Sequence, residues 1–151
     1  MSDIRLARRS FLRGCAGAWL FLAAAPLPVA RAATTAVGFD DLYERETVLT
    51  AKLEALNGQE VEMVGYMAPP LKAEAAFFVL TRTPMAVCPF CETEMQWPDD
   101  IVLVLTDEIL SAVPYNVRIR VRGRLDLGFE KDKATGFVSL IRLESAEFDR
   151  V

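Results

Sequence analysis

One stretch of the sequence decides the fold: residues 117–127 read VRIRVRGRLDL. Charged side chains occupy every second position, and the positions between them are apolar apart from Gly123. Successive side chains of a strand point to opposite faces, so this alternation predicts a strand with one buried and one solvated face. The solvated face would carry a ladder of four arginines, Arg118, Arg120, Arg122 and Arg124.

Four further segments have the pattern of strands. Residues 61–65 alternate and end at Pro69-Pro70, and residues 137–148 follow a turn over 130–136. Residues 76–81 and 101–105 are almost continuously apolar, which predicts more deeply buried strands.

Two segments have the pattern of helices. Apolar residues from Phe39 to Leu56 recur at an imperfect helical spacing that ends at Asn57-Gly58, so we expect one helix or two short ones within residues 33–58. Residues 107–113 predict a short helix with Thr106 as its N-cap and Pro114 as its end.

Together these elements predict a mainly β protein. Three strands, a short helix and two more strands, with Gly65 and Gly123 where long strands would bend, favour a small five-stranded OB-like Greek-key barrel over residues 59–151, preceded by an N-terminal helix. A different β-barrel or a sandwich is the alternative. A thioredoxin fold fits less well, because it needs parallel strands that alternate with long helices.

The first 32 residues have the composition of an export signal. They hold five arginines and one aspartate, whereas residues 33–151 hold twelve Lys and Arg against twenty Asp and Glu. A charged start, an apolar run over 16–25 and the ending Ala30-Arg31-Ala32 predict a secretory signal peptide cleaved after Ala32. Residues 8–13, RRSFLR, resemble a twin-arginine signal. That resemblance implies a bacterial protein that folds in the cytoplasm and reaches the periplasm through the Tat translocase.

The chain has no histidine. This excludes Ser-His-Asp and Cys-His nucleophiles, HExxH metalloproteases and every histidine-ligated zinc or haem. After cleavage at Ala32, the mature chain would keep two cysteines, Cys88 and Cys91.

These cysteines form the sequence Cys88-Pro89-Phe90-Cys91, in the long connection between the second and third strands. Connections longer than about 12–15 residues are usually functional or disordered. The pair could be a plain disulfide, and a bridge that closes only four residues would contribute about 2 kcal/mol. Catalysis as a thiol–disulfide oxidoreductase is less favoured, since Glu92 and Glu94 would raise the pKa of a nearby thiol.

Metal binding is the third interpretation. Zn(II) would need further ligands from Glu92, Glu94, Asp99 or a second subunit. Cu(I) accepts thiolates together with thioethers, and Met85 and Met95 place four sulfurs within eleven residues. Metal capture in the reducing cytoplasm would also explain export in the folded state.

The arginine ladder has a structural explanation that competes with anion binding. We expect its arginines to pair across strands with Glu60, Glu62, Glu144 or Glu147. Nucleic-acid binding is not expected, because an exported acidic domain would be repelled by phosphate chains.

Several segments of the chain are similar to small exported bacterial proteins of unknown function. These segments are residues 65–71, GYMAPPL, and Phe77-Phe78-Val79-Leu80, Cys88-Pro89-Phe90-Cys91, Trp97-Pro98 and Gly136-Phe137-Val138. Those proteins carry a cysteine-containing loop on an OB-like barrel, and some are encoded beside metal-linked ABC transporters. Their loop has a Cys-x-His that this chain lacks. The resemblance implies metal handling at the cell envelope, with a membrane transporter or a periplasmic metal protein as partner. We therefore expect a non-enzymatic periplasmic protein with Cys88, Cys91, Met85 and Met95 as metal ligands; a thiol–disulfide oxidoreductase and an interaction module with a static disulfide remain the alternatives.

Overall fold

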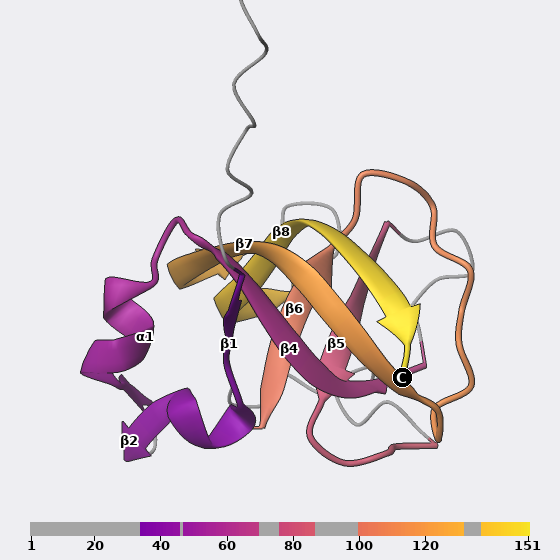
Figure 1. Ribbon diagram of the computed structural model, residues 1–151, viewed down its shortest axis with the longest axis horizontal. Helices are drawn as coiled ribbons and strands as arrows, with labels where there is room; N and C mark the ends of the chain where they lie inside the picture. Colours follow the sequence, from indigo (N-terminus) through magenta and orange to yellow (C-terminus); the bar gives the residue numbers. More distant parts are fainter. Residues whose placement is uncertain (1–33, 46, 70–75, 87–99, 132–136) are drawn as a thin grey trace, which may run out of the picture. The chain divides into compact units, whose positions relative to one another are not determined.

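Strand pairing defines the architecture of the protein (Figure 1). The computed structural model describes residues 34–45, 47–69, 76–86, 100–131 and 137–151. Within these residues, six strands form one sheet in the order β1-β4-β5-β6-β8-β7. They are β1 (Thr35–Ala36), β4 (Glu60–Met67), β5 (Phe77–Thr81), β6 (Ile101–Leu105), β7 (Arg118–Lys131) and β8 (Val138–Arg150). The chain is therefore mainly β, as the sequence predicted.

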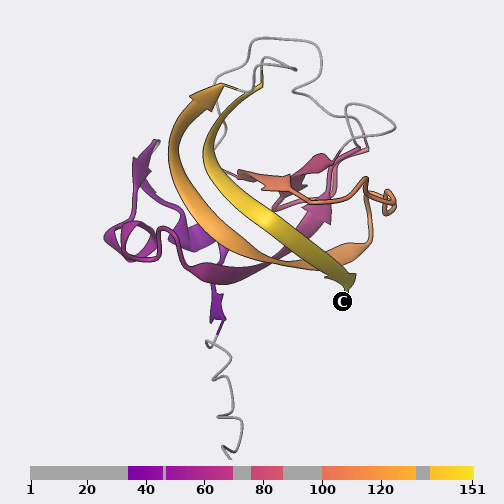
Figure 2. The same cartoon turned by 90° about the horizontal axis from the view of Figure 1, so that it is seen from above.

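Among the described strands, the pairings of five form a closed cycle. β4 pairs with β5 on one side and with β7 on the other, β7 pairs with β8, β8 with β6, and β6 with β5. All of these pairings are antiparallel except that of β6 with β8, which are parallel. Figure 2 shows the strong curvature of β7 and β8 that accompanies this arrangement.

The strand predicted over residues 117–127 is confirmed as the first part of β7. Ile119, Val121 and Leu125 are fully buried, whereas the arginines between them are half-buried or exposed. The four other predicted strands are confirmed as β4, β5, β6 and β8. Alternation in the sequence therefore identified β7 and its buried face, and short apolar runs identified β5 and β6.

Two glycines lie where another strand approaches closely. A methyl group at Gly65 of β4 would stand 2.7 Å from the carbonyl oxygen of Thr81, and one at Gly123 of β7 would stand 3.0 Å from that of Glu144. A side chain at Gly65 would therefore force the backbone to shift, and one at Gly123 would require its neighbours to move by a few tenths of an ångström. At Gly65 the strand β4 also gains its second partner, because the next residues, Tyr66 and Met67, pair with β5.

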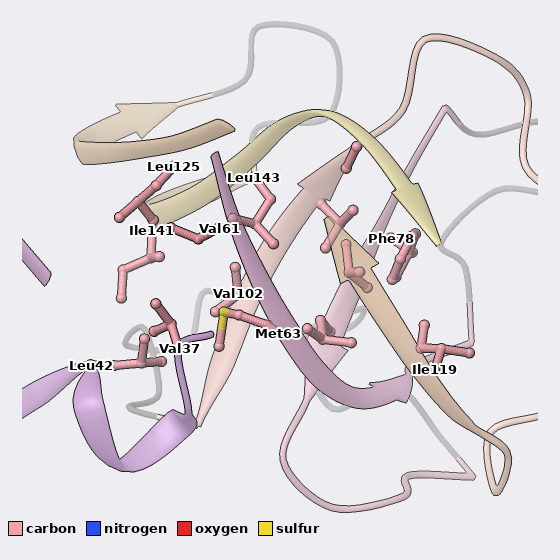
Figure 3. Close-up of a cluster of buried hydrophobic side chains, with 14 of the residues drawn as sticks. Val37, Leu42, Val61, Met63, Phe78, Val102, Ile119, Leu125, Ile141 and Leu143 are labelled. Atoms are coloured by element: carbon pink, nitrogen blue, oxygen red, sulfur yellow. The ribbon is translucent and has the colours of Figure 1, made fainter. Parts of the chain in front are cut away.

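Side chains from all strands of the cycle meet in one apolar core (Figure 3). Phe78 of β5 and Val102 of β6 lie opposite Ile119 of β7 and Leu143 of β8, and each is at most 1 % exposed. Burial of one such side chain contributes about 1.5–3 kcal/mol. The ring of Phe78 also meets Phe148 edge-on, with centroids 5.3 Å apart.

The N-terminal segment is only partly helical. It contains a 3-10 turn, Phe39–Asp41, and one short helix, α1 (Ala51–Ala55), and between them lies the hairpin of β2 (Tyr43–Arg45) and β3 (Val48–Leu49). β-Branched Val48 and Thr50 favour extended backbone, and the Thr50 side chain accepts from the Leu53 amide as the N-cap of α1. The N-terminal helix expected within residues 33–58 is therefore not confirmed: the described part of this segment contains a 3-10 turn, the short helix α1 and strands that the sequence pattern did not indicate.

The helix predicted over residues 107–113 is wrong. All of these residues are described and none is helical. Thr106 does not cap a helix, since its hydroxyl donates to the carbonyl oxygen of Glu108 over 2.8 Å. The amide of Val113 instead donates to Sδ of Met67 over 3.4 Å, which holds this connection against β4.

The predicted signal peptide, residues 1–32, lies outside the described residues. The described residues all belong to one unit, Ala32–Val151. In the part of the chain that the structure describes, no helix is long and apolar enough to cross a membrane.

Candidate functional site

The predicted site lies in the connection between β5 and β6. Of its sulfur ligands, Cys88, Cys91 and Met95 lie outside the described residues, as does Trp97. Met85 is described and is half-buried, four residues after the end of β5. The described residues therefore define the base of this loop.

The two ends of the loop are held together by the sheet. β5 and β6 are antiparallel neighbours, and Thr81 pairs with Ile101 at the end of their ladder. Just beyond this pair, the amide of Arg82 donates to the carbonyl oxygen of Asp100 over 3.1 Å. Because the sheet already joins these ends, the entropic cost of closing the loop is met when the sheet folds.

A buried threonine fixes the first turn of the loop. Thr81 is fully buried, and its hydroxyl oxygen lies 2.7 Å from the carbonyl oxygen of Thr83 and 3.2 Å from that of Tyr66. A buried hydroxyl needs such a partner, since an unsatisfied one costs about 1–3 kcal/mol. Thr81 therefore connects the start of the loop to β4 as well as to β5.

An ion pair links the same end of the loop to the N-terminal segment. Nη2 of Arg82 lies 2.7 Å from Oδ1 of Asp40 in the 3-10 turn. Both side chains are more than half exposed, and pairs of this kind contribute at most about 1 kcal/mol. The contact orients Arg82 but adds little stability.

The base of the loop also borders an apolar cluster outside the main core. Ala68, Val79 and Ile101 form this cluster and are each at most 3 % exposed, and Phe137 packs against them. Val79 lies between Phe78 and Leu80, which point into the main core, so the cluster occupies the opposite face of β5 and β6. Both faces of this strand pair are therefore buried.

Most of the proposed metal ligands lie outside the described residues. The acidic residues considered for zinc, Glu92, Glu94 and Asp99, lie outside the described residues. Within the described ranges, no three cysteine, aspartate or glutamate side chains are grouped as metal ligands would be. Metal binding by the loop stays a prediction.

The arginine ladder of β7 pairs with carboxylates of both neighbouring strands, as predicted. Glu62 of β4 lies 3.1 Å from Nε of Arg120 and accepts from Nε of Arg122 over 2.8 Å. Arg124 donates to Glu144 of β8. Three rungs of the ladder are therefore occupied by cross-strand ion pairs.

Arg142 of β8 forms a buried charged cluster that the sequence reasoning missed. Its side chain is 6 % exposed, and Nε donates to Oδ2 of Asp126 over 2.8 Å. Nη1 donates to the carbonyl oxygen of Gly128 over 2.8 Å and to Oγ of Ser139 over 3.1 Å. Gly128 has a φ of 131° at a register shift in β7, so Arg142 holds this bulge. The available signal was an arginine inside the apolar run Leu140-Ile141-Arg142-Leu143.

Asp41 at the 3-10 turn has a perturbed pKa. Lys52 donates to its Oδ1 over 2.8 Å, and the Gly38 amide donates to its Oδ2 over 3.0 Å. These two hydrogen bonds, that of Lys52 first, lower the pKa of Asp41 below its ordinary value of 3.8. Asp41 thereby connects the 3-10 turn to α1.

Comparisons with known proteins identify a fold neighbour. No family model matches the chain, and no curated protein sequence matches it. The chain is similar to the crystal structure of a DUF3299 family protein from Pseudomonas aeruginosa, with a TM-score of 0.53 and 13 % sequence identity. The match covers 79 % of this chain and 97 % of that one. At this identity the likeness shows the fold alone, and the neighbour's family is one of unknown function.

Proposed function

We propose that this chain is a non-enzymatic periplasmic protein that binds a soft transition metal, Cu(I) or Zn(II), through Cys88 and Cys91 with Met85 and Met95 as supporting ligands. One observation carries the proposal: four sulfurs lie within eleven residues of a chain that has no histidine. Thiolate and thioether sulfurs favour Cu(I), whereas zinc would need oxygen ligands in addition.

The base of the loop supports this proposal. The sheet joins Thr81 to Ile101, and the Arg82 amide bonds to Asp100. Met85 is four residues from this joined base and three before Cys88. A site whose ends are already fixed loses less conformational entropy when the metal binds.

Export by the twin-arginine route is part of the same proposal. Metal bound in the reducing cytoplasm would reach the periplasm in a folded protein and would be passed to a membrane transporter or to a periplasmic metal protein. N-terminal sequencing of exported protein tests the route, and the mature chain is expected to start at Ala33.

We also propose that the sheet is an OB-like Greek-key barrel. The support is its strand order, in which the pairings return from β7 to β4, with β6 and β8 parallel. The short β1 adds to β4 outside this cycle.

The central experiment is competition between reduced protein and a Cu(I) chelator, repeated with Zn(II). Replacement of both cysteines, Cys88→Ser with Cys91→Ser, should weaken Cu(I) binding by more than roughly a hundredfold. Loss of a hydrogen-bond partner of a metal ligand can already cost that much, and this variant removes two ligands themselves. Full-length Cys15→Ser is the matched control, because it removes a cysteine outside the loop and should leave the affinity unchanged.

The metal content and the redox state of the wild-type protein, purified from the periplasm, separate the alternatives. A stable disulfide without bound metal would contradict the proposal and indicate an interaction module. A metal-free disulfide between the two cysteines that glutathione reduces easily would contradict it and indicate a thiol–disulfide oxidoreductase.

A further inference from the structure

A pocket opens between β8 and the connection from β6 to β7, outside the cysteine loop. Its volume is about 470 Å³, and residues 106–111 and 145–148 line it. Ligand pockets in proteins usually measure about 300–1,000 Å³. Figures 1 and 2 show the connection that follows β6 passing the arrowhead of β8.

One wall of the pocket is a strand edge. β8 pairs with β6 at Arg142 and Leu143, and within the described residues its later part pairs with β7 alone. The pocket residues 145–148 lie in that later part. An edge of this kind presents backbone amide and carbonyl groups on which another strand can pair.

The pairing with β6 stops where β6 ends at Leu105 and where β8 has a bulge. Arg124 pairs with Glu144 and Arg122 with Glu147, so one residue of β7 stands opposite two of β8. Ser145, the first of these two, has a φ of 46°, which is rare outside glycine. Bulges bend their strand and are frequent beside binding sites.

The lining of the pocket is acidic and apolar. Its carboxylates are Asp107, Glu108 and Glu147, and among the described residues that line it there is no lysine or arginine. Ile109 on its rim is 66 % exposed, and Leu110 and Phe148 add apolar surface. Such a surface attracts cations that also carry apolar groups.

We propose that this pocket docks an extended basic segment of a partner protein, which adds to the edge of β8 as a strand. The backbone of the segment would pair with β8 over residues 145–148, and its lysine or arginine side chains would face the three carboxylates. Peptides that add to a sheet edge bind in this way, with main-chain hydrogen bonds for affinity and side-chain contacts for specificity.

The test is a titration of the full chain with a synthetic peptide of three alternating valine–lysine pairs, followed by backbone amide NMR. We expect saturable shifts confined to residues 106–111 and 145–149. The double variant Asp107→Lys with Glu147→Lys should weaken binding by at least about tenfold. Glu44→Lys with Glu54→Lys is the matched control, because both residues are exposed and lie outside the pocket; it makes the same change in net charge and should leave binding within about twofold, since distant surface charges are screened by salt.

Three outcomes would overturn the proposal. Equal binding of a peptide with N-methylated backbone would show a side-chain pocket for organic cations rather than strand addition. Equal weakening by the control variant would show unspecific attraction between charges. Concentration-dependent shifts at residues 145–149 without peptide would show that a second copy of this chain occupies the edge.

Discussion

The outer face of β4, β7 and β8 is charged, whereas the outer face of β5 and β6 is apolar. On the first, Arg120, Arg122 and Arg124 pair with glutamates of the neighbouring strands. On the second, Val79 and Ile101 are buried in a cluster of their own. The two faces belong to one cycle of strands but are stabilised by different interactions.

The difference shows where the molecule can support a functional loop. Exposed ion pairs contribute little to the free energy of unfolding, and salt weakens them. Burial of apolar side chains contributes more and is not weakened by salt. The cysteine loop starts and ends at β5 and β6, the strands that are buried on both faces. Its base therefore rests on the more strongly stabilised part of the sheet.

The largest effect is expected from Ile101→Ala at the end of the loop. Ile101 is fully buried, and removal of a buried isoleucine side chain costs about 2–5 kcal/mol of the free energy of unfolding. Urea unfolding of the chain measures this loss. Ile109→Ala is the matched control, because Ile109 is 66 % exposed and should change stability by less than about 0.5 kcal/mol. Similar values for the two variants would mean that the outer face of β5 and β6 is not a stabilising interface.

The next effect is expected where the two faces meet, at Gly65. In Gly65→Ala the new methyl group would stand 2.7 Å from the carbonyl oxygen of Thr81, and such overpacking costs about 1–3 kcal/mol. Gly38→Ala places its methyl group 3.6 Å from Asp41 Oδ2 and should change stability by less than about 1 kcal/mol. Unfolding curves of the two variants that coincide would contradict the close approach of β4 and β5.

The same comparison explains how much of the fold the sequence predicted. Five strands were recognisable because their side chains alternate, as at Ile119 and Val121, or form short apolar runs, as in residues 101–105. The hairpin of β2 and β3 was not, because its strands are too short to show alternation. The helix over residues 107–113 was wrong for two reasons. The Thr106 hydroxyl bonds to the nearby carbonyl oxygen of Glu108, and the Val113 amide has a tertiary partner, Met67, that no local pattern reveals.

The candidate site was predictable only in part. Cys88 and Cys91 are recognisable from their spacing, but the residues that fix the base of their loop are not. Thr81 matters because its hydroxyl reaches the carbonyl oxygen of Thr83 and lies near that of Tyr66. The cluster around Arg142 depends on a bulge at Gly128, and a bulge cannot be located before the register of the two strands is known.

A smaller effect is expected on the charged face. Arg122→Gln removes the ion pairs with Glu62 and Asp149, and such half-exposed pairs are worth about 0.2–1 kcal/mol. The loss should vanish in about 1 M NaCl, where the Debye length falls to about 3 Å. Arg118→Gln is the control: Arg118 is exposed, and among the described side chains no carboxylate pairs with it. A loss that persists at high salt would mean that Arg122 stabilises the face by packing.

The smallest effect is expected from acid, at the carboxylate whose pKa is shifted. The hydrogen bonds from Lys52 and Gly38 lower the pKa of Asp41 in the folded protein, so the folded state binds its proton less readily than the unfolded state. The contribution is therefore fully present above the ordinary pKa of 3.8 and is lost as the pH falls through the lower folded value. Asp41→Asn should cost about 0.5 kcal/mol or less at pH 7, because both partners are partly exposed. The difference from the wild type should shrink as the pH is lowered below about 4, whereas the cost of Ile101→Ala should stay constant over the same range. A difference for Asp41→Asn that grows in acid would show that the carboxylate destabilises the fold, and the charged contacts of this protein would then need a different explanation.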